Sequence, residues 1–257
     1  MPKTVELIGP SGVGKSSLYF ALQKRWRVND DWAIYHDFKY KRKKWSPEGI
    51  LLKLQSMAFA VSNTDYIWDE GKISDQKKAF ANRHPEFVET FLDLIHEHAK
   101  VGFNGEDKRF QVIFFMFKSI ERINRVMEDF SDDRVCLIDE GLVSRLMHLN
   151  SPSFSKKDVE RYISTMPLPD AIIYLNTEAD EILKRIDKRE KTSTIHSGLT
   201  DSEIIESTKN TQELIDFSLS KLEKSGVEVL RLNAKKQVKS LAAETIGFFE
   251  QIYRQGR

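Results

Sequence analysis

Gly9-Pro10-Ser11-Gly12-Val13-Gly14-Lys15-Ser16 lies close to the start of a chain of 257 residues. The stretch fits the pattern G-x-x-x-x-G-K-[ST], in which glycine-rich backbone surrounds phosphate groups. A strand is predicted over residues 4–8, directly before it, and a helix from Ser17 onward. Backbone N–H groups and the positive end of that helix would then face an anion. The sequence therefore predicts a phosphate-binding loop, the P-loop; the alternative is a glycine-rich turn without a ligand.

Two side chains of this loop have separate expected tasks. Lys15 would reach the β- and γ-phosphates of a nucleotide, and Ser16 would hold Mg²⁺ through its hydroxyl. We therefore expect ATP and Mg²⁺ as cofactors.

The amino-acid composition indicates which partners and which cellular compartment to expect. The chain has 40 Lys and Arg against 39 Asp and Glu, a net charge of +1, so it offers no global field for nucleic acid or membrane. Its only cysteine, Cys136, lies in an apolar run, which excludes an intrachain disulfide and predicts a buried position. Neither an apolar signal core nor a run of 18 apolar residues is found, so a cytoplasmic protein is expected.

Five apolar segments predict strands, and each is followed by a predicted helix. The strands are expected at residues 4–8, at the centre of 30–37, and at 135–140, 171–175 and 227–232. This alternation is typical of an α/β fold, with a parallel sheet covered on both faces and right-handed crossovers. We expect one domain over residues 1–257.

A largely helical segment, residues 46–130, separates the second and third predicted strands. Amphipathic helices are expected at 46–62, 85–101 and 106–130, whereas 63–82 shows no strong period. Residues 112–117 are so apolar that we expect the last helix to be covered on most sides, either by the core or by a second subunit. A homodimer is therefore left open.

The Mg²⁺ site of a P-loop needs an acid at the end of a neighbouring strand. Asp139 is the best candidate, because it follows the only other strand that is wholly apolar. Glu140 is a second candidate for the same role. The alternative is that both acids cap the next helix.

A predicted helix over 178–189 carries a cluster of basic residues. Arg185 and Arg189 are four positions apart and therefore share one helical face. Arginine binds phosphate through a planar fork of donors and keeps its charge. Both are candidate catalytic residues, and Arg185 also a candidate nucleotide-binding residue; the alternative is a solvated charged helix.

Together these features resemble the nucleoside and nucleoside-monophosphate kinases of the P-loop class, nearest to thymidylate kinases. The resemblance rests on the N-terminal P-loop, the strand ending in Asp139, Pro169-Asp170 before residues 172–175, and the Arg185-x-x-x-Arg189 run. It covers about residues 1–30 and 130–257. It implies a P-loop NTPase three-layer sandwich with strand order 2-3-1-4-5.

The resemblance also implies roles for individual segments. Residues 185–200 would form a short lid that closes over ATP and supplies the arginines. The loop at Asn233-Ala234 would lie beside the adenine. Asp37, after the second strand, would orient an acceptor hydroxyl or take its proton; the alternative for Asp37 is a helix cap or loop acid.

Some positions depart from the family. Thymidylate kinases usually have Asp-Arg, and deoxynucleoside kinases Glu-Arg-Ser, where this chain has Asp139-Glu140. The second strand lacks the family's Glu-Pro, and residues 46–130 match no family pattern. Because that region builds the acceptor pocket in these kinases, the acceptor stays open.

The sequence thus predicts an ATP- and Mg²⁺-dependent phosphotransferase acting on a nucleoside, nucleotide or similar small acceptor. A first alternative is a polynucleotide or modified-base DNA kinase, since residues 39–45 contain five basic and two aromatic residues. Near-neutral net charge argues against it. A second alternative is a P-loop ATPase or GTPase module without kinase activity, although no Asn-Lys-x-Asp guanine motif is evident.

Overall fold

The computed structural model describes residues 2–27, 30–38, 70–98, 108–128, 133–149, 155–188 and 198–256. Within them, five parallel strands form one sheet in the order β2-β3-β1-β4-β5. The strands are β1 (Lys3–Ile8), β2 (Trp32–Ile34), β3 (Val135–Ile138), β4 (Ala171–Asn176) and β5 (Glu228–Asn233). The predicted α/β fold and strand order are confirmed, and the ends of β1, β3, β4 and β5 differ from the predicted ones by at most two residues.

The sheet is buried because its central strands are apolar on both faces. Every residue of β3 is buried, Cys136 included, and so are the first five residues of β4. Unbroken apolar runs of this kind suit parallel strands that carry helices on both sides. At the edge of the sheet, β5 keeps only Leu232 buried.

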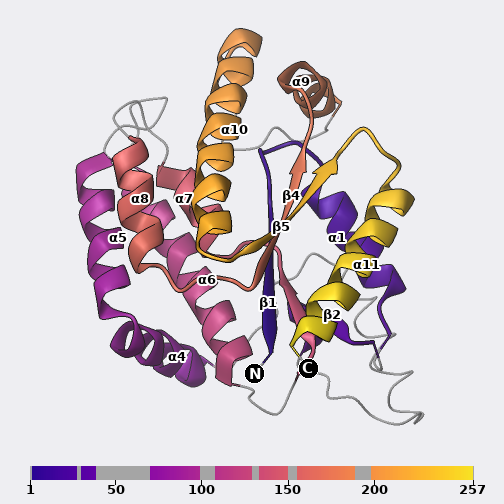
Figure 1. Ribbon diagram of the computed structural model, residues 1–257. Helices are drawn as coiled ribbons and strands as arrows, with labels where there is room; N and C mark the ends of the chain where they lie inside the picture. The colour runs from indigo at the N-terminus through magenta and orange to yellow at the C-terminus, as the bar shows by residue number, and fades with distance from the viewer. Residues whose placement is uncertain are drawn as a thin grey trace.

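Helices cover the sheet on two faces, which gives three layers (Figure 1). On one face lie α1 (Lys15–Arg25) and α11 (Val238–Gln255), which pack against each other. On the other face lie α6 against β3, α7 against β1 and α10 against β5. The remaining bounds are α6 (Arg109–Glu128), α7 (Leu142–Leu146), α8 (Lys156–Thr165), α9 (Ala179–Asp187) and α10 (Asp201–Lys224).

Between β2 and β3 the structure describes α2 (Tyr35–Phe38), α4 (Glu70–Arg83), α5 (Pro85–His98) and α6. The helices predicted at 85–101 and 106–130 are confirmed over the described residues 85–98 and 109–128. Residues 63–82 show no strong period in the sequence, but α4 begins at Glu70, in agreement with a largely helical segment. Polar residues dominate α4, whose Phe80 packs against Phe87 of α5, so its helical period is hidden in the sequence. The helix predicted at 46–62 lies outside the described residues.

Within the described residues, α6 is buried along one side only. Its buried side includes Val112, Met116 and Ile120, but Phe110 is 81% exposed. Phe114 and Phe117 are also exposed. Within the described part of this single chain, α6 is therefore amphipathic, and cover of its exposed side by a second subunit stays a prediction.

After β3 the sequence predicts a helix without bounds, and the structure has two helices there. One is α7, followed by a single 3-10 turn (Met147–Leu149); the other is α8. Ser155 and Asp158 form a capping box at the start of α8, a signal that was present in the sequence. Among the described residues, none of the helices combines the length and apolar character needed to cross a membrane.

Candidate active site

The P-loop connects the end of β1 to the start of α1 through tightly curved backbone. Gly9 has φ 152° and Gly12 has φ 91°, values that side-chain-bearing residues rarely adopt. A Cβ atom at Gly9 would lie 2.3 Å from the carbonyl oxygen of Leu175. A Cβ at Gly12 would lie 2.9 Å from Ile186 of α9. Both positions therefore require glycine, for conformation and for space.

The start of α1 has the properties of an anion-binding site. No side chain caps it, and its first turn contains no acidic residue. The first N–H groups of a helix have no partner within the helix, and the helix dipole adds positive potential there. Ser16 and Ser17 are exposed in this turn. The loop and the helix start thus form a cradle that suits a phosphate group.

Lys15 bends back over the loop. Its Nζ donates to the carbonyl oxygens of Gly9 at 2.7 Å and Pro10 at 2.9 Å. The ammonium group therefore lies against the backbone of the P-loop itself, close to where the loop would surround a phosphate group.

Arg185 of α9 connects three parts of the site. Its Nη1 donates to the carbonyl of Val13 in the P-loop at 2.8 Å, and its Nη2 donates to the carbonyl of Ala234 at 2.9 Å. Its Nε donates to Glu181 at 3.3 Å. The structure thus brings Arg185 to the P-loop, where it holds the loop after β5 against it. Arg189, like residues 190–197 of the predicted lid, lies outside the described residues.

A cavity of about 590 Å³ lies beside the carboxyl ends of β4 and β5. Its lining residues are Tyr174, Asn176, Thr177, Glu178, Gln212, Asp216, Arg231, Leu232 and Asn233. It borders the loop to which Arg185 donates. Adenine binding near Asn233 and Ala234 stays a prediction.

Asp139 lies at the end of β3, next to β1 in the sheet. Its Oδ1 accepts from Nη1 of Arg122 at 3.1 Å. Arg122 comes from α6 and lies over the ring of Tyr35 at 5.8 Å. Burial lowers the pKa of Arg122, but Asp139 and Glu140 outweigh this and raise it. Sequence reasoning missed Arg122, because the contact depends on how α6 packs.

Glu140 pairs with a different arginine. Its Oε2 accepts from Nη2 of Arg145 at 2.7 Å, and Arg145 is only 1% exposed. Arg145 also donates through Nε to Ser119 and lies over the ring of Phe115. Burial raises the pKa of Glu140, yet Arg145 reverses this and holds it below its usual value. A buried guanidinium needs a counter-charge, and Glu140 provides it for Arg145.

His148, another residue not predicted, lies in the same region. Burial, Arg145 and more weakly Lys15 lower its pKa to about 4. The imidazole is therefore neutral at pH 7. Its Nδ1 lies 3.1 Å from the carbonyl oxygen of Ser144, which assigns the hydrogen to Nδ1 and leaves Nε2 as an acceptor.

Asp37 lies in α2, which directly follows β2 and contacts β3 and α6. The backbone thus brings it to the same edge of the sheet as Asp139. Its side chain is outside the described part of the structure, so the predicted role of Asp37 stays a prediction. The basic run 39–45 also lies outside the described residues.

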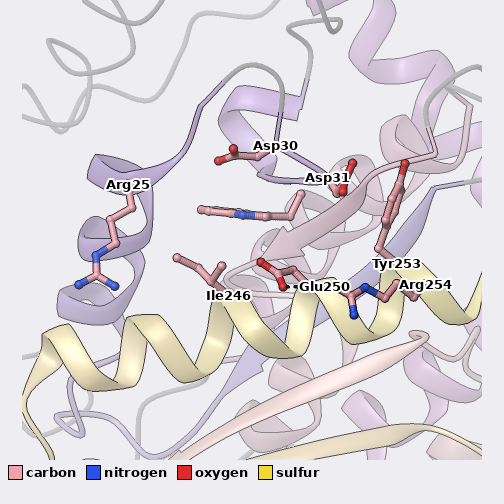
Figure 2. A pocket seen from close by; sticks show the side chains of 8 residues that line it. Arg25, Asp30, Asp31, Ile246, Glu250, Tyr253 and Arg254 are labelled. Atoms are coloured by element: carbon pink, nitrogen blue, oxygen red, sulfur yellow. Dashed lines mark ion pairs between the residues drawn. The ribbon is translucent and has the colours of Figure 1, made fainter.

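A separate pocket of about 530 Å³ is shown in Figure 2. Its lining residues are Arg25, Asp30, Asp31, Trp32, Ile246, Glu250, Tyr253 and Arg254. They come from the end of α1, from the middle and end of α11, and from Trp32 of β2 with the two residues before it. Because the P-loop follows the carboxyl end of β1, this pocket lies at the opposite end of the sheet, away from the candidate site.

No family model matches the sequence, and no curated protein matches it. Solved structures do match. A deoxyadenosine kinase from M. mycoides, with dCMP and dCDP bound, aligns with 96% of this chain and 99% of its own at 14% identity and TM-score 0.50. The same enzyme with dATP gives the same identity and coverage with TM-score 0.47. A shikimate kinase from Bacteroides thetaiotaomicron aligns with 96% of this chain and 98% of its own at 16% identity and TM-score 0.34.

The first of these matches extends over nearly the whole chain. Together with the strand order and the P-loop, it shows that the chain has the P-loop NTPase fold found in this deoxyadenosine kinase. The two matches with TM-scores below 0.5 add nothing to this conclusion.

Proposed function

We propose that this chain is an ATP- and Mg²⁺-dependent kinase for a nucleoside, a nucleotide or a similar small acceptor. The observation that carries the proposal is the cradle of positive-φ glycines at the uncapped start of α1, with Lys15 folded over it. The likeness to a deoxyadenosine kinase supports a nucleoside-type acceptor over the thymidylate-kinase subtype. The kinase would be one domain and act in the cytoplasm.

The P-loop residues would bind the donor. The N–H groups at the start of α1 would donate to the phosphates, and Lys15 would place its charge on the transferred group. The donor set for Mg²⁺ would be the hydroxyl of Ser16 and the carboxylate of Asp139, oxygen ligands of the kind this ion prefers. Mg²⁺, when bound, would neutralise phosphate charge. Asp139 would keep one oxygen for Arg122 and offer the other.

The remaining residues would order the site around the donor. Arg185 would keep the loop after β5 against the P-loop, and Arg189, with the lid 185–200, would close over the phosphates and exclude water. Asp37 would orient the acceptor hydroxyl or take its proton. The acceptor would approach from the side of residues 46–130.

A phosphate-transfer screen tests this proposal. Labelled ATP is offered with nucleosides, nucleotides, sugars and oligonucleotides, and Lys15→Ala is the control. We expect transfer to a nucleoside or nucleotide by the wild type, and a loss of at least about 100-fold in kcat in the variant, because Lys15 acts on transition-state charge. Near-wild-type turnover by Lys15→Ala would contradict the kinase proposal. Hydrolysis of ATP without transfer to any acceptor would favour an ATPase module, and transfer to oligonucleotides alone would favour a polynucleotide kinase.

A further inference from the structure

Glu6 is a carboxylate in the middle of the strand that leads to the P-loop. It is 2% exposed, and its neighbours on the adjacent strands are Ile138 and Ile172. A buried carboxylate is costly unless hydrogen bonds compensate it. The N–H of Leu142 donates to its Oε1 at 2.9 Å, and the N–H of Val143 donates to its Oε2 at 3.0 Å. Glu6 therefore joins β1 to the first turn of α7.

Gly141 shows that the fit between these segments is close. Its φ of −85° and ψ of −161° are open to any residue, so the backbone does not require glycine. A Cβ atom at this position would lie 2.1 Å from the carboxyl carbon of Glu6. Glycine is therefore required by the presence of the Glu6 side chain.

The same segment is held from two other helices. The hydroxyl of Tyr162 on α8 donates to the carbonyl of Leu142 at 2.8 Å. Ser119 on α6 donates to the carbonyl of Glu140 at 2.6 Å and accepts from Arg145. Among these contacts, only that of Glu6 comes from the strand that carries the P-loop.

We propose that Glu6 is a positioning residue, which fixes the segment 139–143 relative to the P-loop through the N–H groups of Leu142 and Val143. This inference rests on the proposed function, in which Asp139 must keep a constant position beside Lys15 and Ser16. Because Glu6 is 2% exposed, it would act without touching nucleotide or acceptor. Its effect passes through the backbone of α7.

The protonation state of Glu6 changes the strength of this connection. Burial raises its pKa to about 7, against the opposing effect of the backbone N–H groups of Leu142, Val143 and Ser144 and of the Arg145 charge. The charged or titratable groups that face it are Arg145 on α7 and Tyr162 on α8. Protonation occupies one of the two acceptor oxygens. The segment should therefore be held more firmly above pH 7 than below it.

The first test compares Glu6→Gln with the wild type. The amide group of glutamine keeps one acceptor and turns a donor toward the other N–H. We expect hydrogen exchange at Leu142 and Val143 to become about 10-fold faster or more, the effect of losing one hydrogen bond. We expect kcat to fall by a similar factor with little change in the KM for ATP. Thr245→Val, which removes a buried hydrogen bond within α11, is the matched control and should change neither quantity.

A pH series measures two further quantities, kcat and the free energy of unfolding. If Glu6 had only a structural role, these two would not change in opposite directions with pH. The wild-type kcat should fall below about pH 7, and this decline should be missing from Glu6→Gln. The folded-state pKa lies above the ordinary value of 4.5. The stabilising contribution of Glu6 is therefore complete below pH 4.5 and is lost as the pH rises through 7. Relative to Glu6→Gln, the wild type should lose unfolding free energy across this window while it gains activity.

A double substitution keeps the inference testable if Glu6→Gln fails to fold. Gly141→Ala alone should displace the segment and accelerate exchange at Leu142 and Val143, because its Cβ overlaps the Glu6 carboxylate. In a Glu6→Ala background the same change should have little further effect. Three outcomes would overturn the inference. The first is unchanged exchange in Gly141→Ala, and the second is an equal effect of Gly141→Ala in both backgrounds. The third is wild-type exchange and wild-type kcat in Glu6→Gln. A wild type without phosphoryl transfer would overturn the proposed function instead, and the exchange data would still decide whether Glu6 fixes the segment.

Discussion

Asp139 and Glu140 are adjacent in the chain but bind different arginines. Glu140 compensates Arg145, whose side chain is 1% exposed and would otherwise be a buried charge without a partner. Asp139 pairs through one oxygen with Arg122, whose side chain is 17% exposed. Because Arg122 is less deeply buried than Arg145, it depends less on its carboxylate partner, and Asp139 is the acid that can more easily bind a metal ion.

Parallel substitutions separate these roles. We expect Asp139→Asn to lower kcat by about 100-fold or more and to shift the activation curve to higher Mg²⁺ concentration, because a metal ligand loses its charge. We expect Glu140→Gln to leave the Mg²⁺ dependence unchanged and to lower the free energy of unfolding by about 1–3 kcal/mol, the scale of a charged hydrogen bond. Activity against Mg²⁺ concentration and urea unfolding measure the two effects. The reverse outcome, with Glu140→Gln shifting the Mg²⁺ curve, would assign the metal to Glu140.

At the scale of elements, α9 is joined to the P-loop by both backbone and side-chain contacts. Ile182 and Ile186 lie against Gly12, and Arg185 donates to Val13 and Ala234. A movement of α9 would therefore shift the phosphate-binding loop. The helix that leads into the predicted lid is thus connected directly to the P-loop.

Arg185→Ala tests this connection against Lys184→Ala, its exposed neighbour on the same helix. We expect Arg185→Ala to lower kcat by about 10- to 100-fold and to raise the KM for ATP by less, because its contacts position groups that act in the transition state. Steady-state kinetics measure both constants. Equal kcat and equal KM for ATP in the two variants would mean that Arg185 does not position groups of the site.

Elements with strong local signals could be predicted from the sequence, and those stabilised by distant contacts could not. The runs at 135–138 and 171–175 are apolar throughout, which in a chain of this length indicates buried strands. Along α4 the described burial is confined to Phe80, so its sequence carries no clear period. For α6, apolar content alone does not say which side the core of the same chain covers, and the structure shows this side to include Val112, Met116 and Ile120.

The same distinction applies to the site. The P-loop is a local motif, and Lys15, Arg185 and Asp139 could be proposed from spacing and strand ends. Arg122 lies 17 positions before its partner Asp139, and Glu6 lies 136 positions before Leu142. Contacts of this kind depend on the packed fold, so no pattern in the sequence indicates them.

At the scale of the whole molecule, charge is nearly balanced, so binding of a charged polymer would depend on a local patch. The densest basic run in the sequence, residues 39–45, begins directly after α2. That helix contacts β3 and α6, on the acceptor side of the proposed site. The run therefore provides the test that separates a small acceptor from a polynucleotide.

We expect combined substitution of Lys41, Arg42, Lys43 and Lys44 by serine to leave the KM of a nucleoside or nucleotide acceptor almost unchanged. A small ligand has too few charged groups to contact several of these residues at once. For a polynucleotide acceptor, each lost phosphate contact should make the slope of log K against log salt shallower by about one. Replacing Lys24, Lys221, Lys224 and Arg254 by serine removes the same charge from helix ends at the opposite edge of the sheet and serves as the control. The measurement is oligonucleotide affinity at several salt concentrations. A change of several units in the slope, confined to the first variant, would contradict the proposal of a small-molecule kinase and favour a polynucleotide kinase.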